Sequence, residues 1–110
     1  METPVEKATA AFRQPPHCYN CAQTVCAAFG REDLTEAMSC CGGGRAPEGM
    51  CGSLYGATQV LPEKAGEIVA GFEAALGATR CRDLKGAQKV PCPVCVRTAA
   101  ELVMRAEAQG

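Results

Sequence analysis

The chain has to build its core from small side chains, because large aromatic residues are almost missing from it. Aromatic residues make up 5% of its 110 residues and none is tryptophan, whereas hydrophobic residues make up 47%. A core of alanine, valine, leucine and cysteine favours closely packed helices over a sandwich of strands, which prefer β-branched and aromatic residues. A chain of this length most simply forms one domain. We therefore expect a single all-α domain.

Helix start and stop signals divide this domain into about five short helices. Asn20 is a good N-cap for a first helix, and Gly30 follows it as a stop signal. Residues 1–17 are expected to form an N-terminal tail with one helical turn around 5–12, and residues 18–110 the cysteine-rich helical domain. No segment has the pattern of a strand. The predicted helices cover residues 21–29, about 35–40, 51–61 and 62–76, a short piece at 80–84 and a last helix from 91 onward.

Composition excludes several classes of function and points to thiol chemistry. The net charge is −1 and no block of basic residues is present, so a nucleic-acid partner is not expected. The longest apolar segment, residues 50–61, is too short to span a membrane. The first 16 residues contain charges and no apolar stretch of a secretory signal, which predicts a cytoplasmic protein with reduced thiols. Nine cysteines in such a chain indicate metal binding or redox chemistry.

Cys51 stands at the centre of the pattern, where a glycine-rich loop is predicted to become a helix. The run of glycines 42–44 precedes it, and Gly52 and Gly56 follow it. Glycines allow close packing and leave room beside the sulfur. The unpaired N–H groups of a first helical turn also favour a thiolate over a thiol.

Two C-x-x-C pairs, Cys18/Cys21 and Cys92/Cys95, form a second cysteine pattern. This spacing lets two sulfurs converge on one metal or close a disulfide. The second pair resembles a dithiol oxidoreductase motif, but the βαβ pattern of a thioredoxin-like fold is missing around it. Cys95 is either a ligand or a residue of the helix face.

The remaining candidates have simpler interpretations. Cys26 lies among small apolar residues and is expected to be a buried, hydrophobic side chain. Cys40 and Cys41 are neighbours, and a disulfide between them would be strained, so either one is a ligand or both are unpaired. His17, the only histidine, is expected to be solvated.

Several of these segments together resemble the C-GCAxxG-C-C family of redox-active proteins, some of which are selenoproteins. The segments are 20–25, 51–57 and 81–84 together with Cys92, and the resemblance covers roughly residues 18–103. A related module in split-Soret cytochromes is associated with an iron–sulfur centre. Ser53 departs from the family motif, which has alanine there, and five cysteines are additional to it. The four cysteines of the family correspond to Cys21, Cys51, Cys81 and Cys92.

This resemblance implies a small iron–sulfur protein for electron transfer or for redox or cluster sensing. A 4Fe–4S cluster is favoured and a second cluster is possible, because eight thiolates would serve two such clusters. Peptide N–H groups of Gly43, Gly44 and Gly52 would bind its sulfides. We expect a redox partner protein and allow for a homodimer. The ligands of first choice are Cys21, Cys51, Cys81 and Cys92, followed by Cys18, Cys95 and Cys41.

Three alternatives stay open from the sequence. A thiol–disulfide redox protein would use Cys92 or Cys51 to attack and Cys95 or Cys21 to resolve. A thiolate site for zinc or Cu(I) would use the same sulfurs. A helical interaction domain with buried cysteines is disfavoured by the number of thiols. The sequence does not decide whether the protein is an enzyme.

Overall fold

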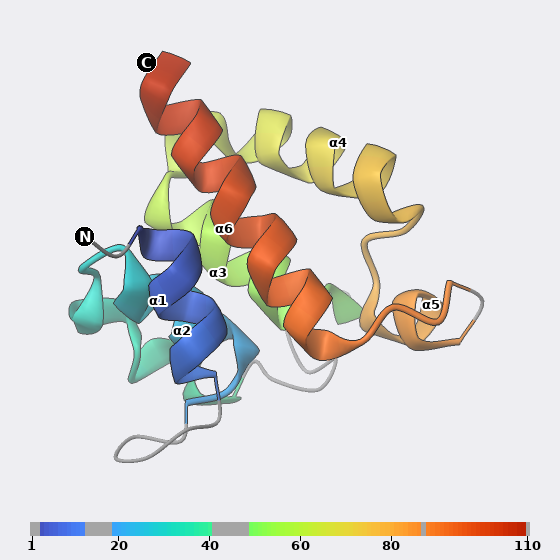
Figure 1. Ribbon diagram of the computed structural model, residues 1–110, viewed down its shortest axis with the longest axis horizontal. Coiled ribbons are helices and arrows are strands. Elements are labelled where there is room, and N and C mark those ends of the chain that lie inside the picture. The colour runs from blue at the N-terminus through green and yellow to red at the C-terminus, as the bar shows by residue number, and fades with distance from the viewer. Residues whose placement is uncertain (1–2, 13–18, 41–48, 87, 110) are drawn as a thin grey trace.

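The helices pack around one long C-terminal helix in the computed structural model, which describes residues 3–12, 19–40, 49–86 and 88–109 (Figure 1). Short 3₁₀ turns at 32–34, 37–40 and 62–64 connect some of them. These residues contain no strand, and the prediction of an all-α domain is confirmed. The α-helices are α1 (Pro4–Ala11), α2 (Cys21–Ala28), α3 (Gly52–Val60), α4 (Ala65–Leu76), α5 (Cys81–Lys85) and α6 (Cys92–Gln109).

Several helices begin and end where local signals predicted. The side-chain oxygen of Asn20 accepts a hydrogen bond from the Gln23 N–H at 2.8 Å, and the Gln23 side chain accepts one from the Asn20 N–H at 3.0 Å. This reciprocal pair satisfies two N–H groups that a helix start leaves unpaired. Gly77 has a φ of +86° and ends α4 in a left-handed conformation that glycine adopts without steric cost. Cys51 precedes α3 as its N-cap.

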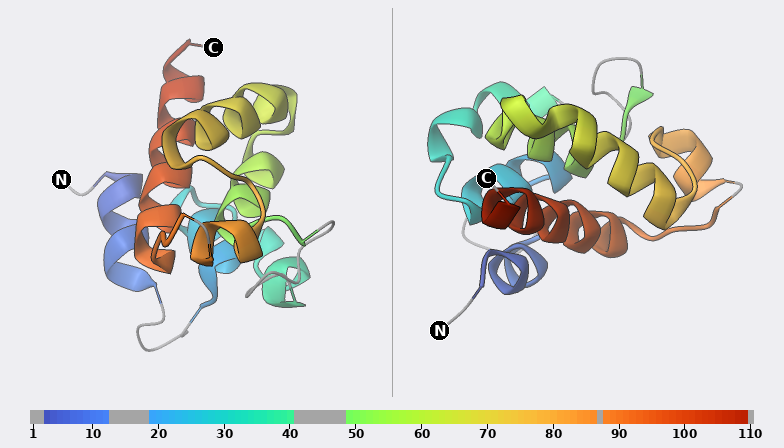
Figure 2. Two further views of the ribbon diagram at one scale, coloured as in Figure 1. Left: turned by 90° about the vertical axis from the view of Figure 1, so that its right-hand side faces the viewer. Right: turned by 90° about the horizontal axis from the view of Figure 1, so that it is seen from above.

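Helix α6 lies at the centre of the fold. Seen from above, it runs between α1 on one side and α3 and α4 on the other (Figure 2). Four small side chains along it have no exposed surface. They are Val96, Ala99, Ala100 and Val103.

Helices α2 and α3 approach each other so closely that a glycine is required at their crossing. A Cβ atom on Gly56 would lie 2.7 Å from the backbone oxygen of Ala22. The Cys26 thiol donates a hydrogen bond to the Gly56 carbonyl at 3.7 Å across the same crossing. The predicted packing of small residues thus brings the two backbones into direct contact.

The N-terminal segment differs from the predicted tail. Thr3 caps α1 by accepting a hydrogen bond from the Glu6 N–H at 3.2 Å. Ala8 is completely buried and Phe12 is 8% exposed, both in the same core as α6. Residues 4–12 therefore belong to the packed domain, because their apolar face is covered by α6 rather than by solvent.

The predicted second helix near residues 35–40 is also replaced by other structure. The chain forms 3₁₀ turns at 32–34 and 37–40 instead of an α-helix. The Asn20 side-chain amide donates to the carbonyls of Met38 and Ser39 at 3.0 and 3.1 Å. These bonds attach the second turn to the start of α2. Exposed acidic residues leave the segment without the apolar stripe that a longer helix would bury.

No helix in the described ranges is both long and apolar enough to cross a membrane.

Candidate functional site

Five cysteines line one pocket at the end of the domain where helices begin. Four of them stand at a helix start: Cys51 is the N-cap of α3, and the other three are the first residues of α2, α5 and α6. The free volume inside it is about 10 Å³, room for one water-sized molecule, and the pocket is partly open to solvent. Gly52, Ser53, Leu84 and Lys85 complete the lining. The five cysteines are Cys21, Cys51, Cys81, Cys92 and Cys95.

Backbone hydrogen bonds attach the loop before Cys51 to the segment before Cys81. The Cys51 N–H donates to the carbonyl of Thr79 at 2.8 Å, and Met50 pairs with Arg80 in an isolated antiparallel bridge. Residues 30 positions apart in the chain are thereby held side by side. This contact, together with the α2–α3 crossing, places Cys21, Cys51 and Cys81 around one space.

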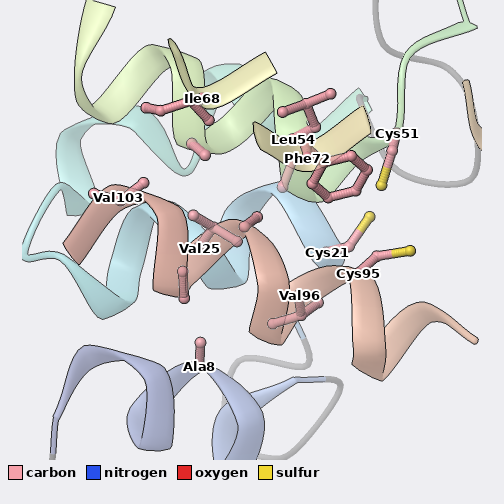
Figure 3. Close-up of a cluster of buried hydrophobic side chains, with 14 of the residues drawn as sticks. Ala8, Cys21, Val25, Cys51, Leu54, Ile68, Phe72, Cys95, Val96 and Val103 are labelled. Carbon is pink, nitrogen blue, oxygen red and sulfur yellow. The ribbon is translucent and has the colours of Figure 1, made fainter. Parts of the chain in front are cut away.

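Cys51 and Cys95 form a hydrogen-bonded pair inside the pocket. Figure 3 shows the sulfurs of Cys21, Cys51 and Cys95 pointing toward one region at the edge of the core. The Cys95 thiol donates to the Cys51 sulfur and lowers the pKa of Cys51 to about 6, even though burial acts in the opposite direction. The N–H groups of Leu54 and Ser53 lower it further. The same bond and burial raise the pKa of Cys95. The two thiols therefore titrate as a coupled pair, in which the first proton is lost more easily than from an isolated cysteine.

Lys85 supplies a positive charge at the open side of the pocket. Its ammonium group donates a hydrogen bond to the Cys92 sulfur, and this bond raises the pKa of Lys85. Burial raises the pKa of Cys81, while the charge of Lys85 acts in the opposite direction. Lys85 lies just beyond the short helical piece predicted at 80–84, and no role was predicted for it. Its spacing of four residues from Cys81 was the available signal, because residues i and i+4 share one helix face.

Ser53 contributes a buried hydroxyl to the lining. It has no exposed surface, and its oxygen lacks a hydrogen-bond partner within the described residues. The hydroxyl lies beside Cys51 and lowers the pKa of that thiol slightly. The sequence analysis noted Ser53 only as a departure from the family motif.

Among the other residues that the sequence singled out, the structure describes Gly52, Cys26 and Cys40. Gly52 lines the pocket, whereas Cys26 lies outside it, is completely buried and confirms the prediction of a small core residue. The backbone of Cys40 belongs to the 3₁₀ turn at 37–40. The remaining predicted residues lie outside the described ranges, namely His17, Cys18, Cys41, Gly43 and Gly44.

The pocket cysteines surround a space and do not converge on a point. Within residues 3–12, 19–40, 49–86 and 88–109, no group of three or more histidine, cysteine, aspartate or glutamate side chains is placed to hold a metal ion. The lining described above nevertheless contains thiols as its only metal-binding side chains. Its chemistry is therefore that of a sulfur donor set with a lysine and helix N–H groups beside it.

We expect the metal-free protein to become more stable as the pH rises from 6 to 8. Folding lowers the pKa of Cys51 from 9.0 to about 6, so in this window unfolding takes up a proton. The free energy of unfolding then increases by about 1 kcal/mol per pH unit. This contribution is lost as the pH falls through the folded pKa.

Urea unfolding at pH 6, 7 and 8 with a thiol reductant measures this slope. Cys51→Ser should make the slope flatter, because the titrating thiol is removed. An equal slope in the variant and the unmodified protein would contradict the assignment of the thiolate to Cys51.

Comparison of the chain with family models, with curated proteins and with solved structures finds no match.

Proposed function

We propose that the five-cysteine pocket binds an iron–sulfur cluster through cysteine thiolates, and that the protein transfers or senses electrons with it. The observation that carries this proposal is the meeting of five thiols from four separate elements around one pocket. A dithiol enzyme needs two such groups. A cluster needs about four, brought from different directions.

The residues present fit the chemistry of such a cluster. Iron–sulfur clusters are held by thiolates, and the described lining offers sulfur donors without a carboxylate or an imidazole. A cluster with four thiolates is an anionic group. The ammonium of Lys85 and the N–H groups at the starts of α2, α3 and α6 offset negative charge in this region. When bound, the cluster would supply one-electron redox chemistry.

The ligands of first choice are the four cysteines at helix starts, which also match the C-GCAxxG-C-C resemblance. They are Cys21, Cys51, Cys81 and Cys92. Cys95 would then remain a thiol that donates to the sulfur of Cys51, as its raised pKa favours. The N–H of Gly52 is available to cluster sulfides at the start of α3. A 4Fe–4S cluster suits four single-cysteine ligands, and its electrons would pass to a partner protein.

A single zinc or copper ion suits the pocket less well. Zinc holds four sulfurs about 2.3 Å from one centre. Within the described residues no group of these side chains is placed around one such point. A cluster distributes its ligands over several iron atoms, which suits thiols that come from four separate elements.

The Cys51–Cys95 hydrogen bond favours thiol–disulfide exchange as a second candidate function. The Cys51 thiolate would attack a disulfide of a partner, form a mixed disulfide and release one partner thiolate. Cys95, once deprotonated, would attack the Cys51 sulfur and release the second. The partner would gain two electrons and two protons, one proton from Cys95 and one from solvent, and the protein would keep a Cys51–Cys95 disulfide.

Anaerobic purification tests the two functions on one sample. We expect a brown protein with broad absorption near 400 nm and with stoichiometric iron and sulfide. A colourless protein that also resists reconstitution with iron and sulfide would contradict cluster binding. Thiol titration of that sample before and after mild oxidation would then test for the loss of the two thiols that exchange requires.

A further inference from the structure

The buried hydroxyl of Ser53 is unusual in this molecule. Buried polar groups in proteins nearly always have a hydrogen-bond partner, and an exception calls for an explanation. The Ser53 oxygen is the one buried side-chain nitrogen or oxygen without a partner in the part of the chain that the structure describes. The other buried hydroxyls behave normally, since Thr24 donates to the Asn20 carbonyl and Thr58 to the Tyr55 carbonyl, each at 2.7 Å.

Packing alone does not explain why the buried hydroxyl of Ser53 lacks a partner. Ser53 lies two residues after Cys51 in the first turn of α3 and lines the five-cysteine pocket. Ser53 is the second residue of α3, so no carbonyl of a preceding helical turn is available to it. Alanine would fill nearly the same space without an unsatisfied group. The hydroxyl therefore lies beside Cys51 in the lining and is available as a donor to an occupant of the pocket.

We propose that the Ser53 hydroxyl donates a hydrogen bond to a sulfur of the bound cluster and thereby raises its reduction potential. This inference rests on the proposed function. Reduction adds an electron and makes the cluster more negative, so a donor to its sulfurs stabilises the reduced form more than the oxidised form. Ser53 thus acts as a positioning residue that tunes the cluster and does not itself bind iron.

Measurements on the loaded and on the metal-free Ser53→Ala variant distinguish this role from a structural one. The loaded variant should contain the same iron and sulfide as the unmodified protein and have a more negative midpoint potential. We expect about a tenfold change in the ratio of oxidised to reduced protein at a fixed potential, which corresponds to ~59 mV for one electron. The metal-free variant should melt at the same or a higher temperature, because an unsatisfied buried group has been removed.

Thr58→Val is the matched control. It removes a buried, satisfied hydroxyl from the same helix, away from the residues that line the pocket. We expect an unchanged midpoint potential and a lower melting temperature, the reverse of the Ser53→Ala result.

An unchanged potential in Ser53→Ala would overturn the inference. So would a lower melting temperature of metal-free Ser53→Ala, since it would assign the hydroxyl to the fold. Failure of the proposed function looks different: the unmodified protein would contain neither iron nor a visible chromophore, and both proposals would fall before any potential is compared.

Discussion

Cys51→Ser will abolish cluster binding while the metal-free protein remains folded. This substitution removes the thiolate that Cys95 and the first turn of α3 stabilise. A serine hydroxyl is a hard donor that does not ionise at neutral pH and is a poor replacement for a thiolate on iron. The measurement is the iron and sulfide content per chain after anaerobic reconstitution, together with the visible spectrum. Circular dichroism of the metal-free variant checks that the helices persist.

Cys26→Ser is the matched control for this prediction. Cys26 is completely buried, whereas Cys51 is 5% exposed, but the sulfur of Cys26 bonds to the Gly56 carbonyl and does not line the pocket. A serine there can donate to the same carbonyl, so we expect nearly full iron content. Equal loss of iron from both variants would mean that the fold, and not a ligand, had been removed.

Cys95→Ser makes the ligand assignment sharper. We expect this variant to keep the cluster, because the other four pocket cysteines supply four thiolates. Loss of the cluster from Cys95→Ser, with retention in one of the other four serine variants, would make Cys95 a ligand and contradict the proposed set.

Gly56→Ala will produce the largest loss of stability expected from a single added methyl group. The new Cβ would meet the backbone oxygen of Ala22 at 2.7 Å, and a backbone atom cannot move without its helix. Overpacking of this kind costs about 1–3 kcal/mol and occasionally more. Separation of α2 from α3 would also displace Cys21 from Cys51, so the variant should retain less iron.

Gly66→Ala provides the same chemical change where space is open. A Cβ on Gly66, near the start of α4, would have no heavy atom within 4 Å. Alanine is the better helix former, so this variant should be more stable by roughly 0.5 kcal/mol. Urea unfolding of the two metal-free variants gives the comparison. Equal stability would show that the helices cross without the close contact at Gly56.

Gly71→Ala should fall between these two variants. Its Cβ would meet a side-chain carbon of Leu102, also at 2.7 Å, but a leucine side chain can rotate away. Gly56→Ala and Gly71→Ala therefore compare two clashes at the same distance of 2.7 Å. The first is with a backbone atom and the second with a side-chain atom.

Local sequence signals were sufficient to predict most of the helices. Asn20, Gly77 and Cys51 each mark a boundary that the structure reproduces. Capping and left-handed termination depend on residues within one turn of the boundary, so neighbours in the chain contain the necessary information. The same signals placed Cys21, Cys51 and Cys92 at helix starts.

Longer-range packing decided the parts that the sequence analysis missed. A tail with one helical turn around 5–12 was predicted before residue 18, but α1 is a packed helix because α6 offers an apolar surface for Ala8 and Phe12. An α-helix was predicted near 35–40, where 3₁₀ turns attached to Asn20 occur instead. In both segments the outcome depends on a partner surface that is distant in the sequence.

The sequence by itself determined that this chain forms helices with cysteines at their starts. Only the tertiary structure decided that four of these starts meet, that Cys95 bonds to Cys51 and that Lys85 reaches Cys92. The physical reason is the distance along the chain between the residues that must make contact. A helix start is specified within a few residues, whereas the meeting of the thiols requires the α2–α3 contact at Gly56 and the bridge from Met50 to Arg80.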